Sequence, residues 1–162
     1  MNVTFRPLPR WPYPEQKHRP AMYQVTYSRT LQDLEREIEK LRGSEVIIGV
    51  VTGSDQIRMD GRMRADAKVQ YPGVEVSFEV PGGQRLVFHT DVHSGYVNSW
   101  QDNLRAIALG LESLRAVNRY GITQGIGEQL REALRRNHPD QGGDPRAFAD
   151  VQAFRRLQGG PA

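Results

Sequence analysis

Cysteine is absent from the 162-residue chain. Without a thiol the protein can form no disulfide, no thiolate nucleophile, no cysteine-ligated zinc site and no iron–sulfur cluster. A chain without a disulfide framework suits a reducing compartment, so we expect a cytoplasmic protein. Thiol chemistry is therefore excluded as its function.

Long apolar runs are missing as well. No segment approaches the roughly 20 consecutive apolar residues that a membrane-spanning helix needs. The amino terminus carries Arg6, Arg10 and several prolines where a secretion signal would have an apolar stretch. Because 38% of the residues are hydrophobic and 25% are charged, the composition is that of a globular chain, and we expect no membrane partner.

Excess charge of one sign is confined to residues 1–22. The formal net charge of the chain is +3, and this segment alone holds four basic side chains against Glu15. The four are Arg6, Arg10, Lys17 and Arg19. The segment also holds five prolines, each of which fixes φ and removes an amide donor. We therefore expect an extended, irregular basic arm over residues 1–22.

Two hypotheses fit this arm. Trp11 and Tyr13 interleave with the basic residues, and such a pattern can stack on nucleic-acid bases while the cations meet phosphates. On that hypothesis Arg6, Arg10, Lys17 and Arg19 are the nucleic-acid contacts. The alternative is that the arm packs its aromatic rings on a sheet of the same chain.

A strand and then a helix are predicted after the arm. Apolar and polar residues alternate from Tyr23 to Ser28, which predicts a short strand with one buried face. The next apolar residues recur at spacings of three, four and three, as in an amphipathic helix; they are Leu31, Leu34, Ile38 and Leu41. We expect Thr30 to cap this helix and Gly43, in a left-handed conformation, to end it.

A central strand and a hairpin follow. The β-branched run 46–51 is apolar on both faces and predicts a strand in the middle of a sheet. Residues 53–68 lose periodicity and are expected to form an exposed loop, with a brief edge strand at Ile57 and Met59. Alternation over 74–80, a Pro-Gly-Gly-Gln turn and a further apolar run predict a β-hairpin whose solvent-exposed face carries Glu75 and Glu79.

The second long helix completes the predicted domain. It is expected to begin at Ser99, with Asp102 in the cap, and its apolar stripe has helical spacing: Val97, Trp100, Leu104, Ile107, Leu111 and Leu114. Residues 23–120 therefore predict an α+β domain, an antiparallel or mixed sheet of about four strands covered by two helices.

A metal site is one interpretation of His89, Asp91 and His93. Their i, i+2, i+4 spacing would place all three on one face of an unbroken strand, as zinc requires. However, Ser94-Gly95 indicates that the strand is ending, and Asp91 can instead cap nearby backbone amides. We favour the second interpretation and expect no metal and no cofactor.

The tail, residues 121–162, contains the most informative motif. A basic helix starting near Glu128 is predicted to end at His138-Pro139-Asp140, and Asp144-Pro145 is typical of the start of a second helix. Apolar residues of the two helices can face each other: Leu130, Ala133 and Leu134 on the first, and Phe148, Val151, Phe154 and Leu157 on the second. The pattern predicts a helical hairpin with His-Pro-Asp at its tip.

This arrangement resembles the J-domain of the DnaJ co-chaperone family, in which a basic second helix, a His-Pro-Asp loop and a third helix with Phe and a late Leu occur in this order. The family usually has lysine where this chain has Gln141 and tyrosine where it has Leu130. The resemblance implies docking on an ATP-bound DnaK-type chaperone and stimulation of its ATP hydrolysis. The implied contact residues are Arg131, Arg135, Arg136, His138, Pro139 and Asp140.

The expected function is therefore that of an adaptor, not an enzyme. The J-like hairpin would engage a DnaK-type chaperone, and residues 23–120 would recruit an unidentified protein target. The chain as a whole also resembles small bacterial and phage proteins that carry such a tail. The alternative is a protein that binds nucleic acid or an assembly, in which the hairpin is purely structural.

Overall fold

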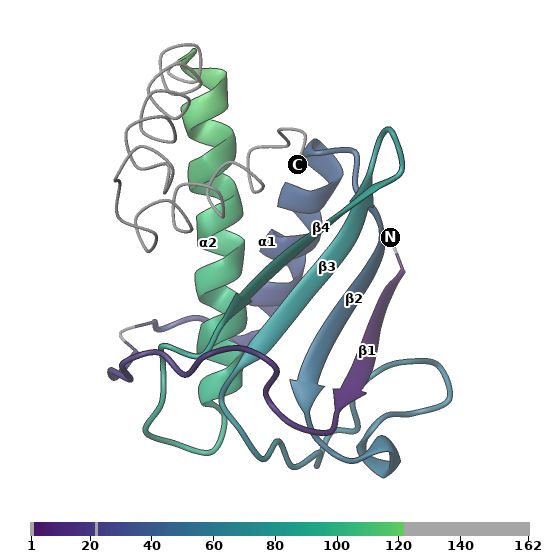
Figure 1. The fold of residues 1–162 in the computed structure, drawn as a ribbon, viewed down its shortest axis with the longest axis vertical. Helices are drawn as coiled ribbons and strands as arrows, with labels where there is room; N and C mark the ends of the chain where they lie inside the picture. Colours follow the sequence, from purple (N-terminus) through teal and green to yellow (C-terminus); the bar gives the residue numbers. More distant parts are fainter. Residues whose placement is uncertain (1, 22, 122–162) are drawn as a thin grey trace, which may run out of the picture. The chain divides into compact units, whose positions relative to one another are not determined.

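A four-stranded mixed sheet and two long helices form the described part of the chain (Figure 1). The computed structural model describes residues 2–21 and 23–121. The elements are β1 (Val3–Leu8), α1 (Tyr27–Lys40), β2 (Ser44–Val51), the short 3-10 helix η1 (Ser54–Gln56), β3 (Val74–Val80), β4 (Gln84–Thr90) and α2 (Ser99–Arg119). The predicted α+β class is confirmed, whereas the predicted tail hairpin lies outside the described residues.

The sheet has the order β1-β2-β3-β4, with β1 parallel to β2 and the other neighbours antiparallel. The predicted central strand and hairpin are both confirmed: β2 lies between β1 and β3, and Val80 pairs with Gln84 across the turn. Gly82 and Gly83 both have positive φ in that turn, a conformation that costs glycine little. The chain divides into two compact units, Met1–Ser113 and Leu114–Ala162.

The prediction of an irregular arm is wrong for Val3–Leu8, which form β1. Pro7 is tolerated because β1 is an edge strand, where a residue without an amide proton breaks no ladder. The Phe5 amide donates instead to the Gly61 carbonyl at 2.6 Å, so the loop after β2 covers part of the outer edge. The prolines argue against a strand in this segment, but β1 forms because it pairs with β2, about 40 residues further along the chain.

The predicted strand at residues 23–28 is also wrong. Helix α1 already begins at Tyr27, and the Thr26 hydroxyl, not that of Thr30, accepts a hydrogen bond from the Arg29 amide. The edge of β2, the next strand along the chain, is occupied by β1, and Tyr27 and Ser28 belong to the first turn of α1. At the other end of α1 the left-handed residue is Arg42, not Gly43.

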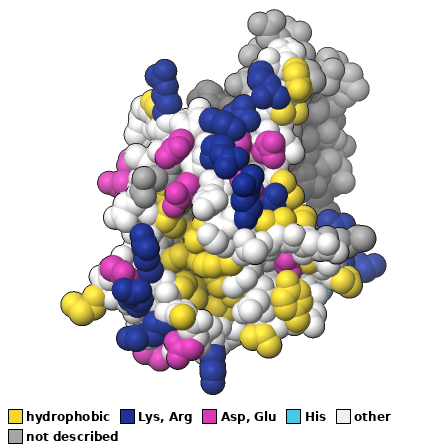
Figure 2. Space-filling view, turned by 180° about the vertical axis from the view of Figure 1, so that it is seen from behind, with side chains coloured by type: hydrophobic (Ala, Val, Ile, Leu, Met, Phe, Trp, Pro, Cys, Tyr) yellow, Lys and Arg dark blue, Asp and Glu magenta, His cyan; other side chains and the backbone are white. Residues whose placement is uncertain are grey.

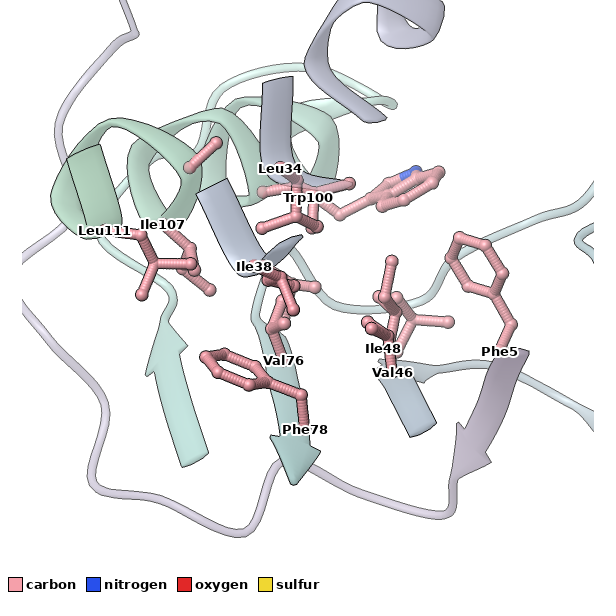
Figure 3. Packing of buried hydrophobic residues seen from close by; sticks show 14 residues of the cluster. Phe5, Leu34, Ile38, Val46, Ile48, Val76, Phe78, Trp100, Ile107 and Leu111 are labelled. Atoms are coloured by element: carbon pink, nitrogen blue, oxygen red, sulfur yellow. The ribbon is translucent and has the colours of Figure 1, made fainter. Parts of the chain in front are cut away.

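The hydrophobic core lies between the sheet and the two helices, which cover the same face (Figures 1 and 3). Leu34 and Ile38 of α1 and the apolar stripe of α2 point toward the sheet. The buried members of that α2 stripe are Trp100, Leu104, Ile107 and Leu111. Val97 and Leu114, which the pattern also assigned to the stripe, are exposed because they lie at its two ends.

The segment between β2 and β3 is a loop, as predicted, with η1 at its start. Ile57 forms an isolated bridge with Met63, while Met59 is fully exposed, so the predicted edge strand at Ile57 and Met59 does not form. In the described ranges no helix has both the length and the apolar character needed to cross a membrane.

Two glycines provide a test of how tightly this core is packed. A methyl group at Gly43 would lie 2.5 Å from Cγ2 of Ile38 and 2.8 Å from Cδ2 of Phe78. We expect Gly43→Ala to lower the free energy of unfolding by about 1–3 kcal/mol through overpacking. Gly110→Ala, in the exposed interior of α2 with no atom within 4 Å, should raise it by about 0.5–1 kcal/mol. Urea denaturation measures both, and equal effects would contradict the packing described.

Candidate functional site

Two carboxylates are buried on the face of the sheet that the helices do not cover. Glu75 of β3 is 6% exposed and Asp91, directly after β4, is 1% exposed. The prediction of a solvent-exposed position for Glu75 is wrong, because residues after β1 run across this face (Figure 1). A carboxylate withdrawn from water needs hydrogen-bond donors, and the arm supplies them.

Glu75 is held by two arm residues. Arg6 Nη2 donates to Oε1 at 2.7 Å, and the Tyr13 hydroxyl donates to Oε2 at 2.6 Å. Burial and the bond to Glu75 raise the pKa of Tyr13 above its ordinary value, so the hydroxyl stays protonated and remains a donor. The Tyr13 ring also stacks on His89, with 3.5 Å between ring centroids. The arm is therefore fixed to both β3 and β4.

Asp91 holds the next part of the arm. Its carboxylate accepts hydrogen bonds from the Tyr71 hydroxyl at 2.6 Å and from the Gln16 amide, which lies 3.3 Å from each oxygen. The Arg19 amide then donates to the Val92 carbonyl at 2.8 Å. Asp91 therefore caps backbone, as its position after the strand indicated.

The metal interpretation of His89, Asp91 and His93 is not supported by their positions. The His89 ring stacks on Tyr13, and the His93 ring packs edge-on against Tyr23. Among the residues that the structure describes, no three histidine or acidic side chains lie close enough to hold a metal ion.

The four candidate nucleic-acid contacts are placed differently from one another. Arg6 is paired with Glu75, whereas Arg10, Lys17 and Arg19 are exposed. Trp11 lies between the arm and the sheet: it is stacked on Tyr71, and a methyl group at Gly73 would lie 2.6 Å from its ring. The alternative that the arm packs its rings on the sheet is confirmed. Trp11 is thus not presented as a platform for a base.

A cavity of about 460 Å³ opens on the helix side of the sheet. It lies between β1, the first turns of α1, residues 62–67 and the start of α2. Figure 2 shows this side of the molecule, where hydrophobic side chains gather near the centre of the view with Lys and Arg side chains to their left. The sequence does not predict the cavity, because residues 53–68 are expected to form an exposed loop with a brief edge strand at Ile57 and Met59; the one available signal is Met63, a large apolar residue among charged ones.

The walls of the cavity are mixed in chemistry. Its apolar lining includes Phe5, Leu31, Met63 and Trp100, together with Tyr27, and burial raises the pKa of Tyr27 to about 12. Its charged lining is Arg62, Arg64 and Glu35. Apolar and polar side chains therefore share the lining, which offers contacts both to an apolar side chain and to polar or charged groups of a ligand.

The partner-binding residues predicted in the tail, Arg131 to Asp140, lie outside the described residues. Comparisons with known proteins add no assignment: no family model, no curated protein and no solved structure matches the chain.

The buried Glu75 makes the attachment of the arm testable. Glu75→Gln removes the charge that pairs with Arg6, and we expect the free energy of unfolding to fall by about 2 kcal/mol. Hydrogen exchange should also accelerate in residues 9–20. Glu79→Gln, on the same face of the same strand and only half buried, should change stability by less than about 0.5 kcal/mol. Indistinguishable variants would contradict this role of Glu75.

The stack of Tyr13 on His89 predicts a pH dependence. Burial lowers the pKa of His89 below its ordinary value, although the Glu75 and Asp91 carboxylates act in the opposite direction. The unfolded chain then binds the proton first, so the free energy of unfolding should fall as pH decreases below about 6.5 and level off once the folded protein is protonated too. Titration of the His89 ring by NMR should give a midpoint below 6.5 that rises in Tyr13→Ala, and a midpoint unchanged by that variant would refute the assignment.

Proposed function

We propose that the protein is an adaptor that engages a DnaK-type chaperone through His138-Pro139-Asp140 and brings it a protein target. The observation that carries the proposal is the order of residues 128–158: a basic helical pattern, His-Pro-Asp, a glycine turn and a second amphipathic pattern with Phe and Leu. This order resembles the J-domain, and both flanking helical patterns accompany the tripeptide.

The charge pattern supports an electrostatic encounter. Arg131 and Arg135 are four residues apart, about one turn of the predicted helix, and Arg136 follows directly, so together they would form a basic patch that attracts an acidic surface and speeds docking. Pro139 restricts the backbone beside Asp140, and a preorganised carboxylate can compete for an arginine of the partner. ATP hydrolysis itself is carried out by the chaperone.

A division of labour within the chain is consistent with this proposal. The division into compact units falls after Ser113, and the first unit has a hydrophobic core of its own. Helix α2 ends at Arg119, and Gly121 has a φ of 71°, a left-handed conformation that stops a helix. In the proposal the first unit selects the target and the tail engages the chaperone.

The proposal predicts that the full chain accelerates ATP hydrolysis by a DnaK-type chaperone under single-turnover conditions. Asp140→Asn and His138→Gln should abolish the acceleration, because each removes a group that the partner would bind. Asp150→Asn makes the same charge change outside the tripeptide and should leave most of it.

Circular dichroism should confirm that all three variants retain the helix content of the parent chain. If the parent chain leaves ATP turnover unchanged with several DnaK-type partners, the proposal fails. It also fails if Asp150→Asn and Asp140→Asn have equal effects.

A further inference from the structure

We infer that the cavity between α1, β1 and residues 62–67 binds a short acidic peptide segment that inserts one large apolar side chain. This inference names the kind of target that the proposed adaptor selects, and its biological role rests on that proposed function. The binding itself involves only the described part of the chain and can be measured without a chaperone.

The cavity has the size and lining for one side chain. Its volume of about 460 Å³ lies within the range of specific binding pockets, and Leu31 and Met63 line it together with aromatic side chains. Methionine adapts its shape to irregular partners because its side chain is flexible and polarisable. An apolar side chain of a peptide would therefore contact Leu31 and Met63 inside the cavity.

The charges at the cavity favour an acidic partner. The Arg62 guanidinium group has no ion-pair or hydrogen-bond partner within the described ranges. Arg64 donates from Nε to the Asp55 carbonyl at 2.7 Å, and within the same ranges no carboxylate pairs with it. Arg58, in the same loop, is by contrast paired with Asp60 at 3.1 Å. Two arginines that have no carboxylate partner among the described residues therefore line the cavity, and Glu35 is the single acidic side chain of that lining.

Peptide fits this site better than nucleic acid does. Phe5 and Trp100 are only 6% and 5% exposed, so neither presents a ring face on which a base can stack. Nucleic-acid binding also relies on several phosphate contacts, whereas the lining of the cavity contains two basic side chains, Arg62 and Arg64.

The peptide would be recognised through its side chains and not by adding a strand to the outer edge of β1. On the outer edge of β1, the Phe5 amide already donates to Gly61 and Pro7 has no amide proton. An added strand would therefore find few donors along this edge. Specificity would therefore come from the cavity and from the two arginines.

The test uses the full chain with carbon-13 in the methionine methyl groups. The probe is the end-blocked peptide Gly-Asp-Asp-Phe-Asp-Asp-Gly, titrated to millimolar concentration. We expect a saturable shift of the Met63 signal, which reports on the cavity, and no shift of the fully exposed Met59 signal. Met59→Leu and Met63→Leu assign the two signals.

Three variants separate the two features of the site. Arg62→Glu combined with Arg64→Glu should weaken binding at least tenfold, and Ala65→Trp, which places a bulky side chain at the exposed rim, should weaken it similarly. Lys68→Glu changes charge in the same loop but outside the lining, and it should weaken binding less than threefold.

The inference is overturned if a peptide with lysine in place of aspartate binds equally well, if no probe shifts Met63, or if Met59 and Met63 shift alike. It is also overturned if a 12-nucleotide single-stranded DNA shifts Met63 and the acidic peptide does not. ATP turnover and peptide binding are measured separately. A chain that does not stimulate a chaperone can still bind the peptide, and a chain that does not bind the peptide can still stimulate a chaperone.

Discussion

The burial of two carboxylates, Glu75 and Asp91, determines how the outer face of the sheet is covered. Ionised groups that leave water must recover their hydrogen bonds from the protein, and the donors come from Arg6, Tyr13 and Gln16. The amino-terminal segment is therefore a third layer of the fold and not a free appendage. The same requirement places β1, since Arg6 reaches Glu75 from that strand.

A third acidic residue, Asp33, joins the two helices on the other side of the sheet. Asp33 of α1 accepts a hydrogen bond from Arg105 of α2 at 2.7 Å and one from Arg29 at 3.1 Å, and these bonds lower the pKa of its carboxyl group. Its bond to Arg105 joins the two helices over the sheet. The cavity lies beside the first turns of α1 and is closed on its far side by the loop that follows η1.

Local patterns were sufficient for elements whose side chains alternate between core and solvent, as in α1, α2 and the hairpin of β3 and β4. Local patterns failed where contacts with residues far away in the sequence determine whether a segment forms a strand or a side chain is buried. Pro7 argues against a strand, yet pairing with the parallel strand β2 stabilises β1. The alternating pattern predicts a solvent-exposed Glu75, but the arm covers this side chain. The cavity was equally invisible, because it is formed by segments from four parts of the chain. The His-Pro-Asp tripeptide is the reverse case, a functional hypothesis supported by sequence and by no described residue.

The amino-terminal segment is separated by many residues from its hydrogen-bond partners, and this separation affects the order in which contacts can form during synthesis. Arg6 and Glu75 are 69 residues apart, and Gln16 and Asp91 are 75 apart. At about 5–20 residues per second, the first strand waits roughly 3–15 s before its carboxylate partners are synthesised. Pro7 and Arg6 in this strand are features that discourage an unpaired strand from pairing with other chains. The hydrogen bonds from Arg6 and Gln16 to these carboxylates can therefore form only after β3 and β4 have been synthesised.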